Sequence, residues 1–185
     1  MSKRMLQRGI CCFLLAVVLT GRAGALGTSA ASAILIEQDS GRVLYEQNAD
    51  EKRLIASITK IMTAVVALEE GDIQAEYTVT AEDMAEGSSM YLKPGDVLTL
   101  EELLYGLMLV SGNDAALAVA HCVAGEEASF VAMMNETAQR LGMEQSFFCN
   151  PNGLDAEGHG SSARDMAVLT AYALKNETFR RIVSA

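Results

Sequence analysis

The segment from Ser57 to Glu70 constrains the fold more than any other part of this chain, because its apolar side chains cover much of a helical circumference. A surface helix keeps its apolar residues to one stripe, whereas a helix that is apolar on several sides is buried. Gly71 follows directly and is a common end to a helix. The sequence therefore predicts a buried helix that other elements must cover. Its apolar positions are Ile58, Ile61, Met62, Val65, Val66 and Leu68.

Four further helices and two or three strands are predicted around it. Asp39-Ser40-Gly41 is a tight turn between two strand-like segments, and a two-stranded ribbon alone is only marginally stable. Residues 72–98 are turn-rich, and we find no repeat or interdomain linker. The sheet therefore looks unfinished beside so many helices. The predicted strands are 33–37, 42–45 and, as a third candidate, 77–80; the predicted helices are 101–109 behind a Thr99–Glu102 capping box, 114–124, 126–141 and one that is capped by Ser162 and Asp165 and reaches about residue 175.

The composition indicates one globular domain with an adequate core, because 50% of the 185 residues are hydrophobic and 21% are charged. The formal net charge is −10, and every acidic residue lies after position 36. Four of the 14 basic residues lie in the first 22 positions, so the rest of the chain is more acidic still. Such a body repels nucleic acid and anionic lipid, and we expect no nucleic-acid partner.

The N-terminus has the order of segments found in a secretory signal peptide. Basic residues in the first eight positions precede an apolar run at 10–20, and small residues follow at 23–25. The alternative is an uncleaved membrane anchor, but an apolar run of about 11 residues is short for a bilayer. We therefore predict a signal peptide at residues 1–25 and an exported domain at residues 26–185.

The cysteines and histidines give no case for a metal or a cofactor. Cys122 and Cys149 would remain after removal of the signal peptide, and whether they pair in an exported protein stays open. Together with His121 and His159 they lie at no spacing typical of a metal site. We therefore expect no metal ligands and no cofactor.

Ser57 and Lys60 form a pair that can carry out nucleophilic chemistry. Residues at i and i+3 share one helix face, with Cβ atoms about 5–6 Å apart, so a neutral amine can remove the proton of the hydroxyl. Burial and the positive end of the helix dipole both lower a lysine pKa, as this role requires. In the alternative interpretation, Ser57 only caps the helix and Lys60 is a surface charge. A bare Ser-x-x-Lys also arises by chance, so the motif alone is a weak signal.

Ser111-Gly112-Asn113 lies where one apolar helix gives way to the next. A junction of two helices can place a hydroxyl and a carboxamide together in a cleft. The alternative is a simple cap-and-turn sequence, because Ser, Gly and Asn all favour such positions. For this segment taken alone, the cap-and-turn interpretation is favoured.

Together and in this order, the two motifs resemble those of the serine D-alanyl-D-alanine carboxypeptidases, the low-molecular-mass penicillin-binding proteins of the β-lactamase-like superfamily. The resemblance covers nearly the whole chain after residue 25. It implies an α/β (α+β) fold of the β-lactamase/transpeptidase type, in which helices flank an antiparallel sheet and an all-helical subdomain stands beside it. The segments that carry the resemblance are Gly41–Tyr45, Ala56–Ala64, Ser111–Ala116, Phe130–Asn135, Asn150–Asp155 and Gly158–Asp165.

The resemblance also implies a function and roles for four residues. Ser57 would attack the carbonyl between the two terminal D-alanines of a peptidoglycan stem peptide, and Lys60 would be the general base. Ser111 would relay a proton to the leaving amine, Asn113 would hydrogen-bond the substrate, and water would then hydrolyse the acyl-enzyme. β-Lactam antibiotics would acylate the same serine. The signal peptide fits this function, because the substrate lies at the outer face of the bacterial cell membrane or in the cell wall.

The third motif of that family, Lys-Thr-Gly, does not occur in these 185 residues, since Lys175 is the one lysine after Ser111 and Asn176 follows it. The resemblance implies that the lysine of that motif binds the substrate carboxylate. It also implies that the backbone of the strand carrying the motif supplies half of the oxyanion hole. We therefore expect a C-terminally truncated chain that lacks the last strands and full activity. A naturally degenerate homologue is the less favoured account.

Two other functions stay open. A class A-like β-lactamase shares Ser-x-x-Lys, but its second motif is usually Ser-Asp-Asn, and no Glu-x-x-x-Asn segment lies between Asn113 and Ala185. A non-catalytic peptidoglycan-binding homologue would use the cleft for binding alone. Membrane contact is expected only through the signal peptide or a missing C-terminal anchor.

Overall fold

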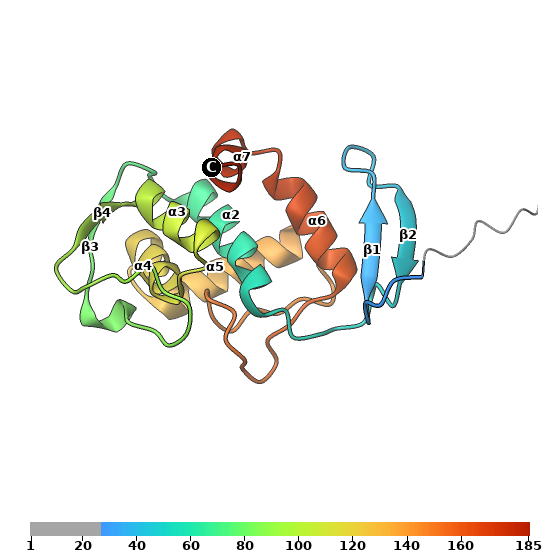
Figure 1. Ribbon diagram of the computed structural model, residues 1–185, viewed down its shortest axis with the longest axis horizontal. Coiled ribbons are helices and arrows are strands. Elements are labelled where there is room, and N and C mark those ends of the chain that lie inside the picture. Colours follow the sequence, from blue (N-terminus) through green and yellow to red (C-terminus); the bar gives the residue numbers. More distant parts are fainter. Residues whose placement is uncertain (1–26) are drawn as a thin grey trace, which may run out of the picture.

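The structure is a computed structural model that describes residues 27–185 (Figure 1). The predicted signal peptide, residues 1–25, and its two cysteines lie outside the described residues. In chain order the elements are β1 (Ala33–Ile36), β2 (Val43–Gln47), the 3₁₀ helix η1 (Ala56–Thr59), α2 (Lys60–Glu70), β3 (Glu76–Thr78), the 3₁₀ helix η2 (Ala81–Asp83), β4 (Val97–Thr99), α3 (Leu100–Leu109), α4 (Asn113–Ala124), α5 (Glu127–Arg140), α6 (Ala163–Ala173) and α7 (Glu177–Val183).

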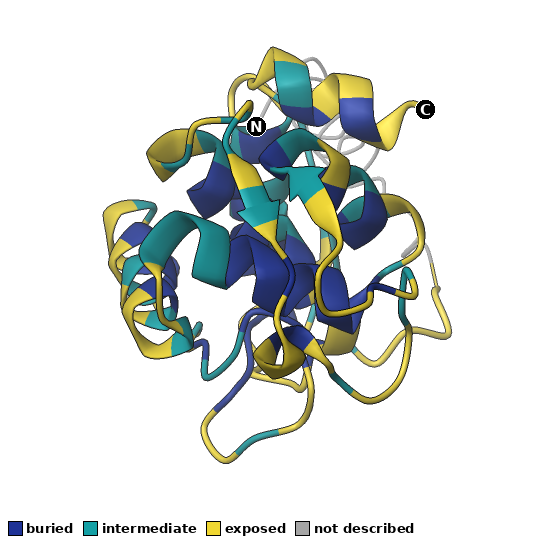
Figure 2. Ribbon diagram, turned by 90° about the vertical axis from the view of Figure 1, so that its left-hand side faces the viewer, coloured by how far each residue is buried: buried dark blue, intermediate teal, exposed yellow. Residues whose placement is uncertain are grey.

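The helix α2 is the centre of the fold, and the helices α3 to α7 all contact it (Figure 1). Its side chains at Met62, Val66 and Ala67 are fully buried, which confirms the predicted buried helix from Lys60 onward. The predicted first turn is instead part of the 3₁₀ helix η1, and its Ile58 side chain is exposed rather than buried. Figure 2 shows the buried part of the ribbon gathered in the central helices. Full burial of an aliphatic or aromatic side chain contributes about 1.5–3 kcal/mol, so packing around α2 is the main source of stability. The largest buried side chains are Phe130, Phe148, Met62, Leu100, Leu103, Leu104 and Leu107.

The predicted capping box at Thr99 and the predicted end of the helix over 114–124 are confirmed. The Thr99 hydroxyl accepts from the Glu102 N–H at 3.2 Å, and the Glu102 carboxylate accepts from the Thr99 N–H at 2.8 Å. Gly125 ends α4 in the left-handed conformation, at φ 76°, where a residue without Cβ is least strained. The chain bends here, and α4 and α5 reach the length and hydropathy of a membrane span only as a pair bent by 87°, while no single helix in residues 27–185 does so.

The cap of α6 differs in one residue from the prediction. Ser162 caps the helix, because its hydroxyl accepts from the Asp165 N–H at 3.1 Å. The Asp165 carboxylate does not cap; it accepts from the Gln145 N–H at 2.8 Å and the Ser146 hydroxyl at 2.7 Å. This buried carboxylate therefore satisfies donors in the loop after α5, which sequence spacing along α6 alone could not indicate.

The strands form two separate antiparallel ribbons within the described part of the chain. β1 pairs with β2, as predicted, and α6 packs against β1. The third predicted strand is present as β3, but it pairs with β4 in a second ribbon rather than extending the first. β4 lies in the region interpreted as turn-rich, because a strand of three residues is too short to show alternation.

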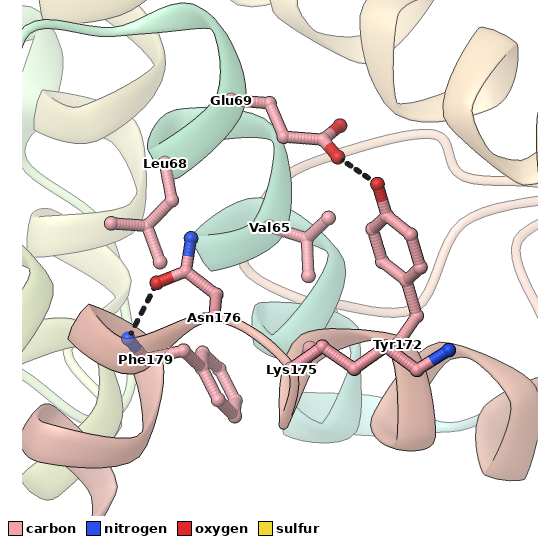
Figure 3. Close-up of a pocket in the computed structure, with 8 residues that line it drawn as sticks. Val65, Leu68, Glu69, Tyr172, Lys175, Asn176 and Phe179 are labelled. Carbon is pink, nitrogen blue, oxygen red and sulfur yellow. Dashed lines mark hydrogen bonds between the residues drawn. The ribbon is translucent and has the colours of Figure 1, made fainter. Parts of the chain in front are cut away.

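One helix, α7, was not predicted. The last predicted helix, α6, ends at Ala173, and Asn176 starts α7 by accepting from the Phe179 N–H at 3.0 Å (Figure 3). The side chains of Phe179 and Ile182 are buried where α7 packs against α2 and α3. Figure 3 shows the small pocket between α2, α6 and α7, where Tyr172 donates to Glu69 beside Val65. Seven residues carry too little periodicity to identify such a helix from sequence.

Candidate active site

The junction of η1 and α2 presents Ser57 and buries Lys60. Ser57 is exposed, whereas Lys60 is 2% exposed. Neither η1 nor α2 has a side-chain cap at its start, so the interpretation of Ser57 as a cap and Lys60 as a surface charge is wrong. Ala56 precedes Ser57 at φ 45°, a conformation that is strained for a residue with Cβ. Backbone strain beside an exposed hydroxyl is a pattern found at functional sites.

Three oxygen atoms surround the amine of Lys60. Its Nζ lies 2.7 Å from Asn113 Oδ1, 2.8 Å from the Asn152 carbonyl oxygen and 3.4 Å from Ser57 Oγ. A charged amine donates to all three; a neutral amine donates to the two carbonyl oxygens and turns its lone pair to the Ser57 hydroxyl. Burial lowers the pKa of Lys60 from 10.5 to about 8, although the charge of Asp114 opposes the change. The arrangement therefore suits proton transfer from Ser57 to Lys60.

The first turn of α4 holds Lys60 and anchors a loop. Asn113 is 5% exposed and uses both ends of its amide, because Oδ1 accepts from Lys60 and Nδ2 donates to the Glu86 carbonyl at 2.6 Å. Burial pushes the pKa of Asp114 up, but hydrogen bonds from Ser89 and from backbone N–H groups outweigh it, so this pKa lies below its usual value. Asp114 is therefore an anion, and it limits how far the pKa of Lys60 falls.

Ser111 is not brought into hydrogen-bond contact with Ser57 or Lys60. It lies between α3 and α4 at φ 56°, and its buried Oγ has no partner among residues 27–185. A buried hydroxyl without a partner costs about 1–3 kcal/mol, so folding alone does not account for a serine here. The structure thus places Ser57, Lys60 and Asn113 together and leaves Ser111 with a free hydroxyl.

A cleft of about 450 Å³ opens beside Ser57. Asn113 forms part of its floor, one wall comes from Gly87 and Ser88, and the other from residues 152–155. The two walls are far apart in sequence. The Ser88 carbonyl accepts from the Asn113 N–H of α4, and the Asn152 carbonyl accepts from Lys60 of α2, so both walls lie beside the same two helices. The cleft is large enough for a short peptide end to lie against the serine.

Segment 150–160 is held rigidly against α2. The Thr63 hydroxyl donates to the Pro151 carbonyl at 2.6 Å, which points the next carbonyl, that of Asn152, at Lys60. The His159 Nδ1 accepts from the Cys149 N–H at 3.1 Å, so its Nε2 carries the proton and lies 2.9 Å from Thr59 Oγ1. Burial lowers the pKa of His159, in agreement with a neutral ring. His159 therefore supports the backbone between Ser57 and Lys60.

Replacement of Gly153 by alanine is expected to destabilise the protein by about 2–4 kcal/mol, from a strained positive φ and an overpacked contact together. Gly153 has φ 86°, and an added Cβ would overlap the carbonyl group of Ala56, next to Ser57. Gly142→Ala is the matched control, because Gly142 also has a positive φ, 71°, but open space around it. Chemical denaturation should show the larger loss for Gly153→Ala; equal losses would contradict the overlap.

Comparison with known proteins shows the family of this chain. The sequence model of the D-alanyl-D-alanine carboxypeptidase family matches residues 20–183. This chain belongs to the D-alanyl-D-alanine carboxypeptidase family. It is 43% identical over 166 residues to the D-alanyl-D-alanine carboxypeptidase DacF of Bacillus subtilis, covering 86% of this chain and 43% of that relative. The chain therefore spans less than half the length of this relative.

Solved structures show the same fold. A penicillin-binding protein homolog from Mycobacterium tuberculosis superposes with a TM-score of 0.85 at 34% identity, covering 90% of this chain and 64% of that one. A D-alanyl-D-alanine carboxypeptidase from the same organism superposes with a TM-score of 0.82 at 36% identity, covering 88% and 64%. The α/β (α+β) fold of the penicillin-binding type is thus confirmed for this family member.

Three participants of the site were missed by sequence reasoning. The Asn152 carbonyl accepts from Lys60 and the Glu86 carbonyl accepts from Asn113, whereas the Asp114 carboxylate holds the neighbouring loop and opposes the lowering of the Lys60 pKa. Asp114 and Asn152 lie in segments singled out for their resemblance, but a backbone carbonyl leaves no mark in a sequence. Cys122 and Cys149 are both free thiols in the structure.

Proposed function

We propose that the protein is a serine D-alanyl-D-alanine carboxypeptidase that removes the terminal D-alanine from peptidoglycan stem peptides. The observation that carries the proposal is a buried lysine amine of lowered pKa, 3.4 Å from an exposed serine hydroxyl that lines a cleft. Membership of the carboxypeptidase family supports the same activity. A class A-like β-lactamase and a non-catalytic peptidoglycan-binding homologue are the alternatives to be tested.

The proposed first step forms an acyl-enzyme. Ser57 Oγ attacks the carbonyl carbon between the two D-alanines, and its proton passes to the neutral amine of Lys60. The peptide C–N bond then breaks, the leaving D-alanine nitrogen receives a proton, and the shortened peptide stays esterified to Ser57. Water attacks the ester, a proton returns to Ser57 Oγ, and the peptide leaves with a free carboxylate.

Ser111 and Asn113 have supporting roles in this proposal. The Ser111 hydroxyl has both a free donor and a free acceptor, as a proton relay to the leaving amine requires. Asn113 holds Lys60 with its oxygen and gives one amide hydrogen to the Glu86 carbonyl, so its second amide hydrogen is left for the substrate.

The partners and location follow from the proposed activity. The substrate is a peptidoglycan stem peptide that ends in D-alanyl-D-alanine, and β-lactam antibiotics acylate Ser57 in its place. We propose that residues 1–25 are a signal peptide that exports the protein, because peptidoglycan lies outside the bacterial cell membrane. The Lys-Thr-Gly triad does not occur in these 185 residues, so full turnover is proposed for the chain extended by any coding sequence that follows Ala185.

The test combines two measurements on the 185-residue chain and on that extended chain. The extended chain is expected to release D-alanine from a peptide ending in D-alanyl-D-alanine and to show slow, stable labelling by a fluorescent penicillin, and the 185-residue chain is expected to release less D-alanine. Rapid hydrolysis of the penicillin would favour the β-lactamase. Binding of the peptide without D-alanine release from the extended chain would favour the non-catalytic homologue.

A further inference from the structure

The loop of residues 84–92, here called the wall loop, forms one side of the cleft through Gly87 and Ser88. It has no helix or strand of its own and joins η2 to the segment before β4. A loop without internal ladders depends on side chains of other elements for its position. Nearly all of those side chains come from one helix, α4.

The first turn of α4 anchors the far end of the wall loop. The Asp114 carboxylate accepts from the Ser89 hydroxyl at 2.6 Å, the Met90 N–H at 3.0 Å and the Leu92 N–H at 3.1 Å. The Asn113 N–H also donates to the Ser88 carbonyl at 2.7 Å. This end of the loop is thus fixed to the same turn that holds Lys60.

The last turn of α4 anchors the near end, through a buried pair outside the cleft. Asp83 is fully buried and ends η2, directly before the wall loop, and His121 Nδ1 lies 2.6 Å from its carboxylate. The carboxylate also accepts from the Tyr77 hydroxyl at 3.0 Å and from the Thr80 N–H at 2.6 Å. Burial raises the pKa of Tyr77 to about 12, so this phenol remains a donor.

The two anchors lie on one face of α4. Asp114 and His121 are seven residues apart, which is about two helical turns, or about 10 Å along the axis. The wall loop is therefore held at two points on the same helix. Its Glu86 carbonyl, which lies between those points, receives the Asn113 amide that in turn holds Lys60.

We propose that the Asp83–His121 pair positions the wall loop and, through the Glu86 carbonyl, the Asn113 amide and Lys60. Neither member of the pair lines the cleft, so these are positioning residues rather than catalytic ones. The inference rests on the proposed function for its kinetic consequence, whereas the position of the loop can be measured without it. Removal of His121 leaves a buried carboxylate short of a partner, which draws η2 and the wall loop towards water.

The experiment measures hydrogen exchange of the backbone amides of residues 84–92 and the rate of labelling by a fluorescent penicillin. In His121→Ala, exchange of these amides should rise at least about tenfold as the loop opens locally, and labelling should slow by about 10–10²-fold. His121→Asn should restore both, because its amide nitrogen takes the place of Nδ1 as a donor to Asp83. Asn176→Ala removes the cap of α7, far from the cleft, and is the control for a general loss of melting temperature.

Each outcome decides the inference. Unchanged exchange of the wall loop in His121→Ala overturns it, as does equal slowing in Asn176→Ala at the same melting temperature. If His121→Ala does not fold, Tyr77→Phe removes one donor to Asp83 and should change exchange and labelling in the same directions by about 2–10-fold. If the extended chain with His121 intact does not label while its wall loop is protected, the proposed function fails and the exchange comparison alone decides the positioning role.

Discussion

Replacement of Lys60 by arginine is expected to slow acylation of Ser57 by about 10²–10⁴-fold, the usual effect of losing a general base. Arginine keeps the charge and much of the stem but holds its proton at any working pH. In the wild type, a pKa of about 8 leaves about one Lys60 in ten neutral at pH 7, against about one in three thousand at the ordinary value of 10.5. The lowered pKa therefore contributes directly to the supply of the reactive form.

The pH dependence gives the control for this variant. Labelling of the wild type by a fluorescent penicillin should speed up as the pH rises through about 8, and this rise should be absent in Lys60→Arg. Because the folded pKa lies below the unfolded one, the unfolded chain binds more protons between about pH 8 and 10.5, so the contribution of Lys60 to stability rises over that interval. Near wild-type labelling by a folded Lys60→Arg chain would show that Lys60 only positions Ser57, and that Ser111 or water is the base.

Local features of the fold were predictable because their signals lie within a few residues of one another. The capping box at Thr99 and the left-handed end at Gly125 are decided by neighbours in the chain, and both are confirmed. The strand β4 was missed because it pairs with β3, about twenty residues earlier, and the helix α7 because its buried face packs on α2 and α3, which are distant in sequence. A short segment of weak periodicity takes its structure from what packs on it.

The candidate site shows the same limit. The spacing of Ser57 and Lys60 was enough to suggest a pair, but only the structure shows that Lys60 is buried between two carbonyl oxygens. One of these oxygens belongs to the backbone of Asn152, 92 residues away, and the backbone has no residue type to recognise. The role of Asp114 was hidden for a related reason, since an acidic residue at the start of a helix already has an ordinary explanation in the helix dipole.

Replacement of Ser57 by alanine is expected to abolish covalent labelling altogether. Among residues 27–185, the Ser57 hydroxyl is the one nucleophilic group of the cleft within hydrogen-bond distance of the Lys60 amine. Ser57 is exposed and caps no helix, so the folded state should keep its melting temperature. Lys60 would retain its two stronger contacts, at 2.7 and 2.8 Å, and stay in place.

Ser129→Ala is the matched control for the nucleophile, since Ser129 is an exposed serine on α5 with no part in the cleft. It should label as fast as the wild type, which separates loss of the nucleophile from loss of an arbitrary surface hydroxyl. Intact-mass measurement after incubation with penicillin gives the number of adducts directly. An adduct on folded Ser57→Ala would show that another residue is acylated. It would contradict the assignment of Ser57 as the nucleophile that Lys60 activates.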